Sequence, residues 1–143
     1  MEWESFCAED TFALGQQIGQ QAVAGEVYTL TGDLGTGKTV FSQGVASGLG
    51  IKGPVSSPTF TILQVYEEGR LPFYHFDVYR ISDPEEMDEI GYEDCIYGEG
   101  VCLIEWASLI QEILPKCYKE IRIEKDFSKS LDYRRITLTA YGT

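Results

Sequence analysis

The spacing of apolar residues along the chain separates helical from extended segments. In residues 8–24, apolar side chains recur every three or four positions and fall on one helical face. Asp10 or Thr11 is suited to cap the start of this helix, and Gly25 is suited to end it. The same reasoning predicts four helices, over residues 8–24, 38–50, 83–91 and 107–114.

Runs rich in β-branched and aromatic residues lie between these helices and predict strands. The run GVCLIEWA at residues 100–107 is almost unbroken in its apolar character, as expected for a strand buried on both faces. Strands are predicted over residues 26–32, 60–69, 71–81, 100–107, 118–126 and 134–142, the second and third joined by a turn at 67–70. Alternating helices and strands predict an α/β fold of three layers, with a central mixed sheet flanked by helices.

Length and composition narrow the class of protein. The chain of 143 residues suits a single domain over residues 1–143, and a hydrophobic fraction of 43% excludes a disordered chain. The formal charge of −12 repels phosphate backbones, so extensive direct binding of nucleic acid is not expected. An acidic surface of this kind suits a basic protein partner.

The cysteines and the hydropathy of the sequence indicate the cellular compartment in which the protein is expected. The four cysteines form no C-x-x-C pair, which is typical of free thiols in a reducing environment. No apolar run approaches the length that spans a bilayer, and the acidic first ten residues do not resemble a signal peptide. We therefore expect a cytoplasmic protein without a membrane segment.

A glycine-rich stretch, GDLGTGKT, follows the first predicted strand and opens the second predicted helix. It matches G-x-x-x-x-G-K-[ST], in which glycines let backbone N–H groups turn inward to cradle an anion. Lys38 supplies charge to the β- and γ-phosphates, and the hydroxyl of Thr39 can ligate Mg²⁺. This predicts a P-loop NTPase fold and a phosphate site at Gly32, Asp33, Leu34, Gly35, Thr36, Gly37, Lys38, Thr39 and Val40. GTPases normally carry N-K-x-D for guanine, and the sequence lacks it, so ATP with Mg²⁺ is the predicted ligand.

Within two predicted strands, the apolar runs VCLIE and FYHFD each end in an acid of the kind that a magnesium site needs. Glu105 ends the more apolar run and is the preferred metal-side acid. Asp77 ends the other run and is a candidate to orient the attacking water, with a strand-end cap as its alternative role. Lys38, Asp77 and Glu105 are thus the candidate catalytic residues, and Thr39 and Glu105 the candidate metal ligands.

Four other residues are candidates for a role near the phosphates, and the sequence favours such a role for only two of them, Ser57 and Thr59. The loop SSPTF places the hydroxyls of Ser57 and Thr59 where a switch segment often lies, although an ordinary turn fits it as well. By strand alternation, the ring of Trp106 points away from the preceding acid, toward the core or a partner surface. His75 is more typical of a hydrogen-bonded strand residue than of a catalyst.

Several motifs together carry a resemblance to a known family. GDLGTGKT, SPTFTIL followed by VY, HFDVYRI, EIGYED and LIEW stand in an order and spacing that resemble TsaE, a family of small bacterial ATPases of tRNA threonylcarbamoyladenosine (t6A) biosynthesis. The similarity covers about residues 11–106. The chain departs from the family at Ala107, where Pro is frequent, and at Val40, where Thr is frequent.

This resemblance implies a function and further contacts. Members of the family join a TsaB–TsaD complex, and their ATP hydrolysis supports turnover of the modifying complex. The resemblance places Asp77, Ser57 and Thr59 near the γ-phosphate, and Thr11 with an arginine of the pair 134–135, here Arg134, beside the base. It also implies a nucleotide-sensing segment at Trp106. Alone, the protein is expected to be a monomer or weak oligomer.

Two other functions fit the same phosphate-binding loop. A small-molecule or nucleotide kinase usually carries an arginine-rich lid, and no basic cluster follows the second predicted helix. A binding module would hold the nucleotide without turnover. Arg80 is more typical of a surface salt bridge than of an arginine finger, so hydrolysis is expected to be slow alone and faster with a partner.

Overall fold

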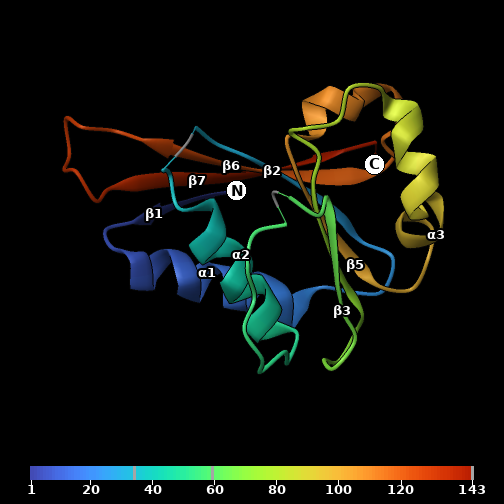
Figure 1. Ribbon diagram of the computed structural model, residues 1–143. Helices are drawn as coiled ribbons and strands as arrows, with labels where there is room; N and C mark the ends of the chain where they lie inside the picture. The colour runs from blue at the N-terminus through green and yellow to red at the C-terminus, as the bar shows by residue number, and fades with distance from the viewer. Residues whose placement is uncertain (34, 59, 143) are drawn as a thin grey trace.

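The computed structural model describes residues 1–33, 35–58 and 60–142, and Figure 1 shows one sheet with helices on both faces. The strands are β1 (Glu2–Ser5), β2 (Val27–Thr31), β3 (Leu63–Tyr66), β4 (Phe73–Asp77), β5 (Val101–Glu105), β6 (Tyr118–Lys125) and β7 (Arg134–Tyr141). They form a seven-stranded sheet in the order β1-β7-β6-β2-β5-β4-β3. The prediction of an α/β fold with a central mixed sheet is confirmed.

The centre of the sheet is parallel and its margins are antiparallel. β4, β5, β2 and β6 run in one direction, whereas β3, β7 and β1 run against their neighbours. All five residues of β5 are buried, as its unbroken apolar sequence predicts. Since the carboxyl ends of parallel strands meet at one edge, the residues that follow β2, β4 and β5 gather there.

Two long helices and three short ones cover the sheet. They are α1 (Ala8–Gln21), α2 (Lys38–Gly48), η1 (Pro84–Ile90), α3 (Tyr92–Ile96) and η2 (Ala107–Ile113). α1 and α2 lie on one face, and η1, α3 and η2 lie on the other, over the β5–β4 end (Figure 1). No helix among the described residues is long and apolar enough to cross a membrane.

The structure corrects the predicted ends of α1. Cys7 is the N-cap, and Thr11 lies within the helix with its hydroxyl buried against Ser5 Oγ, 2.7 Å away. Asp10 lies in the first turn, where its carboxylate accepts a hydrogen bond from the backbone N–H of Phe6. The helix ends at Gln21, before the predicted Gly25, because the chain is already extended at the next residue.

Two short elements escaped the sequence analysis. β1 has four residues, two of them acidic, and it pairs only with β7, so its sequence carries little strand signal. The predicted helix at 83–91 is η1, a 3₁₀ helix that begins with a capping box of Asp83 and Glu86, and α3 follows it as a second, unpredicted helix. Gly91 takes the left-handed conformation (φ 76°) between them, which ends one helix and begins the next.

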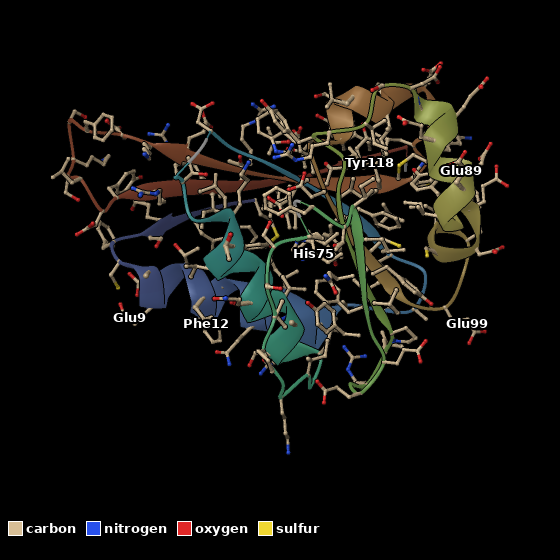
Figure 2. All side chains as sticks on the ribbon, in the orientation of Figure 1. Glu9, Phe12, His75, Glu89, Glu99 and Tyr118 are labelled. Atoms are coloured by element: carbon tan, nitrogen blue, oxygen red, sulfur yellow. The ribbon has the colours of Figure 1, made fainter. Side chains whose placement is uncertain are left out.

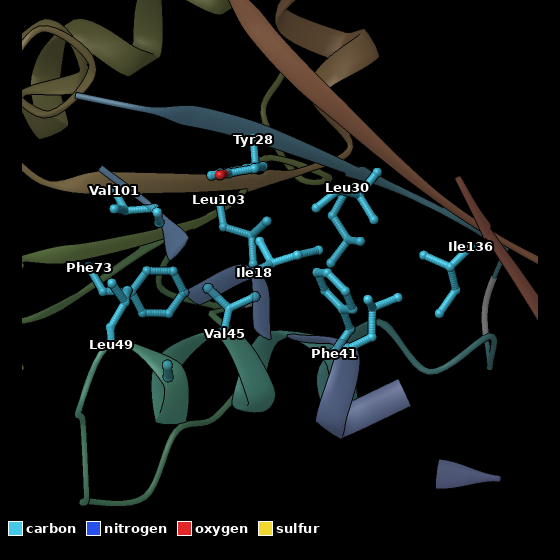
Figure 3. Packing of buried hydrophobic residues seen from close by; sticks show 14 of the residues in the cluster. Ile18, Tyr28, Leu30, Phe41, Val45, Leu49, Phe73, Val101, Leu103 and Ile136 are labelled. Atoms are coloured by element: carbon cyan, nitrogen blue, oxygen red, sulfur yellow. The ribbon is translucent and has the colours of Figure 1, made fainter. Parts of the chain in front are cut away.

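Two apolar cores lie on opposite faces of the sheet. The larger core packs β2, β5 and β6 against α1 and α2. Figure 3 shows Phe41 of α2 below Leu30 of the sheet, and Leu49, the C-cap residue of α2, beside Phe73. The second core lies under η1, α3 and η2. β5 contributes to both cores, since its side chains alternate between them, so it is fixed from both sides.

Glycines bring α1 and α2 into backbone contact. A Cβ atom added at Gly15 or Gly19 would overlap the carbonyl oxygens of Phe41 and Val45 in α2, respectively. In the reverse direction, Gly44 and Gly48 lie against the backbone of α1 in the same way. This close approach fixes the helix that opens at the glycine-rich loop.

We expect Gly19→Ala to destabilise the fold, because the added methyl group forces α1 away from α2. The expected loss is about 1–3 kcal/mol, which lowers the melting temperature by about 2–4 °C per kcal/mol in a domain of this size. Gly53→Ala is the matched control, since Gly53 is exposed and its added Cβ meets only the end of the Glu68 side chain. Equal melting temperatures for the two variants, measured by circular dichroism, would contradict the packing argument.

Candidate functional site

The glycine-rich loop turns sharply between β2 and α2. Gly35 (φ 79°) and Gly37 (φ 103°) take left-handed conformations that other residues adopt only under strain. Thr36 closes the turn, since its backbone N–H and its hydroxyl both donate to the carbonyl of Asp33. The first intrahelical bond of α2 then runs from Phe41 N–H to the Gly37 carbonyl. The loop therefore has the form of an anion cradle at a helix N-terminus.

Gly32 is required by a close approach of the loop to β6. A Cβ atom there would lie 2.6 Å from Thr36 Oγ1 and 2.9 Å from the carbonyl oxygen of Ile123. The loop thus packs on the strand beside β2, with no room for a side chain between them. Leu34, also predicted to bind phosphate, lies outside the described residues.

A cavity of about 750 Å³ opens in front of the loop. It brings together eight of the predicted site residues: Gly35, Gly37, Lys38, Thr39, Val40, Ser57, Asp77 and Glu105. Tyr79, Arg80 and Trp106 also line it. Residues from the loop, from α2 and from the ends of β4 and β5 thus meet in one place, as the parallel centre of the sheet requires.

The two candidate acids stand side by side at the ends of β4 and β5. Asp77 and Glu105 are register partners in the parallel ladder, and each is only 4% exposed. Asp77 Oδ1 accepts from the backbone N–H of Tyr79, so this carboxylate does stabilise the turn after β4, which was its alternative role. The hydroxyl of Thr39 and these two carboxylates supply the oxygen ligands that Mg²⁺ prefers alongside phosphates.

His75 fixes the buried carboxylate of Glu105. Its Nε2 atom lies 2.8 Å from Glu105 Oε2, and its ring stacks on Phe73 with the centroids 5.7 Å apart. Figure 2 shows His75 near the centre of the molecule, and its side chain is 1% exposed. The expected hydrogen bond is thus present at one nitrogen only, because Nδ1 has no partner among the described residues.

Trp106 does not follow the alternation of β5. Its backbone is left-handed (φ 63°), and the prediction that its ring points away from the site is wrong for that reason. Lys38 Nζ lies 4.5 Å from the centroid of the indole ring, and the Tyr79 ring centroid lies 4.8 Å from it. Trp106 therefore holds the loop lysine by a cation–π contact.

Trp106 and Lys38 also line a neighbouring cavity. It has a volume of about 540 Å³ and lies over β2 and β6, where Gly32 and Asp33 contribute to its wall. The polar face of β6 supplies Glu120 and Arg122. Gly32 and Asp33, both predicted to bind phosphate, thus line this smaller cavity and not the larger one.

Thr11 and Arg134, two other predicted residues, lie at the margin of the site. Thr11 is buried beside the loop, and a Cβ atom added at Gly37 would lie 3.9 Å from its methyl group. Ser57 is exposed at the cavity, whereas Thr59 lies outside the described residues. Arg134 lies behind the loop, where its Nε donates to the carbonyl of Thr36 at 2.8 Å. A contact of Thr11 or Arg134 with the base stays a prediction.

Tyr79 and Arg80 complete the cavity wall. No sequence signal marked Tyr79, other than its position two residues after Asp77. The guanidinium of Arg80 lies 4.7 Å from the ring centroid of Phe60, and it forms no salt bridge among the described residues, contrary to the prediction. The rings of Phe60 and Tyr79 are both exposed at this margin.

Comparison with known proteins identifies relatives along nearly the whole chain. The profile of a family described as threonylcarbamoyl adenosine biosynthesis protein TsaE matches residues 6–136. The protein of that name from Bacillus subtilis is 46% identical over 142 residues, covering 99% of this chain and 87% of the relative. Its counterpart in Treponema pallidum is 46% identical over 116 residues, which are 81% and 85% of the two chains.

A solved structure shares the fold. The crystal structure of YdiB from Bacillus subtilis superposes with a TM-score of 0.85 at 42% sequence identity. The superposition covers 99% of this chain and 86% of that one.

We expect His75→Leu to destabilise the protein strongly, because it leaves the Glu105 carboxylate buried without its partner. Leaving a buried acceptor without its hydrogen-bond donor costs about 1–3 kcal/mol, and more for a charged group. His75→Gln keeps an N–H donor of similar reach, so its loss is expected to be smaller. Urea unfolding of both variants measures the difference, and equal losses would show that the hydrogen bond to Glu105 contributes nothing.

Proposed function

This chain belongs to the TsaE family, and from that premise we propose that it is a Mg²⁺-dependent ATPase that supports formation of the threonylcarbamoyl group on adenosine of tRNA. The observation that carries the proposal is the single cavity in which the loop, Lys38, Thr39, Asp77 and Glu105 meet. These groups supply, in one place, the charge and the oxygen ligands that a Mg²⁺-triphosphate requires.

The phosphates are held by the loop and by α2. Backbone N–H groups of the turn and the positive N-terminal end of the helix face the anion. Lys38 leaves the Trp106 ring to pair with the β- and γ-phosphates, because a charge-assisted contact with an oxyanion is stronger than a cation–π contact. Thr39 and Glu105 are the residues that would hold Mg²⁺, and the ion would supply positive charge against the phosphates.

Hydrolysis requires a water aligned with the γ-phosphate. Asp77 stands beside Glu105 at the same edge, and we assign it to orient that water. Arg80 is the arginine in the lining of the larger cavity, but its guanidinium lies against the exposed ring of Phe60. Among the described residues, the cavity therefore has no arginine placed as a finger beside Lys38 to stabilise the transition state, and slow turnover is the expected consequence.

A TsaB–TsaD complex is the proposed partner. Residues 81–115 hold ten of the 23 acidic residues of the chain and no lysine or arginine. Most of these acids are exposed on η1 and α3, and Figure 2 shows Glu89 and Glu99 projecting on that side of the molecule. Such a surface favours contact with a basic protein surface and opposes direct contact with the tRNA backbone.

Glu105→Gln is expected to lower the rate of Mg²⁺-dependent ATP hydrolysis by about 100-fold or more, while ATP affinity changes little. The reason is that the carboxylate acts on the metal, whereas the loop binds the phosphates. Phosphate release and calorimetric binding of Mg·ATP separate the two effects. Asp77→Asn is the comparison variant, and a normal rate for Glu105→Gln with failure of Asp77→Asn would reverse the two assignments.

Partner stimulation tests the biological role. We expect ATP hydrolysis to rise when purified TsaB–TsaD is added, because the complex completes the positioning that the isolated chain lacks. Phosphate release with and without the complex is the measurement, and Lys38→Ala is the control for contaminating ATPase. Equal rates would contradict activation, and a phosphorylated metabolite in cell extract would indicate a kinase instead.

A further inference from the structure

We propose that Arg134 is a positioning residue, which orients the phosphate-binding loop from behind and does not itself touch the nucleotide. The inference rests on the proposed function, because it assigns a role toward the phosphates. It concerns a residue outside both cavities, at the start of β7 and nearly a hundred residues beyond the loop in sequence.

The guanidinium of Arg134 is held by backbone carbonyls on two sides. Toward the loop, Nε donates to Thr36 at 2.8 Å and Nη2 to Gly35 at 3.4 Å. Toward its own hairpin, Nη1 donates to the carbonyls of Leu131 at 2.9 Å and Tyr133 at 2.8 Å. The rigid fork of an arginine side chain suits such divergent acceptors, and a lysine ammonium does not reproduce them.

The hydrogen bond from Arg134 to the Thr36 carbonyl orients the next amide group of the phosphate-binding loop. In a trans peptide the C=O and the following N–H point in opposite directions. Holding the Thr36 oxygen toward Arg134 therefore turns the Gly37 N–H away from the hairpin, and Gly37 lines the larger cavity. A loop with two left-handed glycines has great freedom when unbound, so fixing one peptide plane lowers the entropy lost on binding phosphate.

The hairpin end that carries Arg134 is itself anchored. The buried ring of Tyr133 makes an edge contact with Phe6, and its hydroxyl donates to Glu4 Oε2 at 2.8 Å. β1 and the residue that directly follows it thus support the hairpin end that carries Arg134. The neighbouring Arg135 is different, because it pairs with the carboxylates of Glu2 and Asp126 and has no contact with the loop among the described residues.

The test compares Arg134→Gln with Arg134→Lys and with Arg135→Gln as the matched control. Binding of Mg·ATP and of Mg·tripolyphosphate, which has no base, is measured by calorimetry at a temperature where circular dichroism shows each variant folded. Arg134→Gln should raise both dissociation constants by the same factor, about 10- to 100-fold. Arg134→Lys should give a smaller rise, and Arg135→Gln should leave both constants unchanged.

Other outcomes would overturn the inference. A loss for ATP without a loss for tripolyphosphate would mean that Arg134 contacts the base. Unchanged constants for Arg134→Gln, or equal losses in Arg134→Gln and Arg135→Gln, would mean that its bonds to the loop do not matter for phosphate binding.

Hydrogen exchange separates failure of this inference from failure of the proposed function. Without nucleotide, the amide of Gly37 should exchange faster in Arg134→Gln than in the unaltered protein, because its peptide plane is released. Absence of any Mg·ATP binding by the unaltered protein would refute the proposed function alone. An unchanged exchange rate would refute the role of Arg134 whether or not ATP binds.

Discussion

The structure depends on one constraint: a short loop must hold its amide hydrogens toward a common point between the end of β2 and the start of α2. Glycines make this geometry accessible, but they do not make it rigid. The surroundings supply the rigidity. β2 lies between two parallel neighbours, Gly32 is pressed against β6, and α2 is locked to α1 by glycine contacts along both helices. The proposed anion site thus depends on the whole domain, although its motif is eight residues long.

An acidic protein that binds a highly charged anion must keep most of its negative charges away from the anion site, because like charges repel. Residues 81–115 carry a large part of the negative charge and fold into η1, α3, β5 and η2, mostly away from the loop. The exception is Glu105, whose carboxylate is buried against His75 and faces the cavity. In the proposed function a bound cation offsets that charge, which favours a metal–phosphate complex over a bare phosphate.

The sequence predicted what is encoded locally and missed what depends on distant contacts. The loop motif, the apolar run of β5 and the acids at two strand ends each carry their signal within a few residues, and the structure brings them together. Trp106 escaped because one left-handed residue breaks the alternation on which the prediction relied. The contacts of Arg134 join positions far apart along the chain, and β1 is too short to be recognised without its partner β7. No local pattern records such pairings, so they emerge only from the fold.

The end of β5 links the two charges on which the site depends. Glu105 presents its carboxylate on one side, and the next residue, Trp106, offers its ring to the ammonium group of Lys38. A cation–π contact of about 0.5–2 kcal/mol keeps this lysine ordered without satisfying its charge. Charge-assisted hydrogen bonds to phosphate are stronger, so in the proposed function the lysine exchanges the ring for the anion at small cost. η2 begins at the residue after Trp106, so one strand end joins the metal-side acid, the lysine contact and the helix that follows β5.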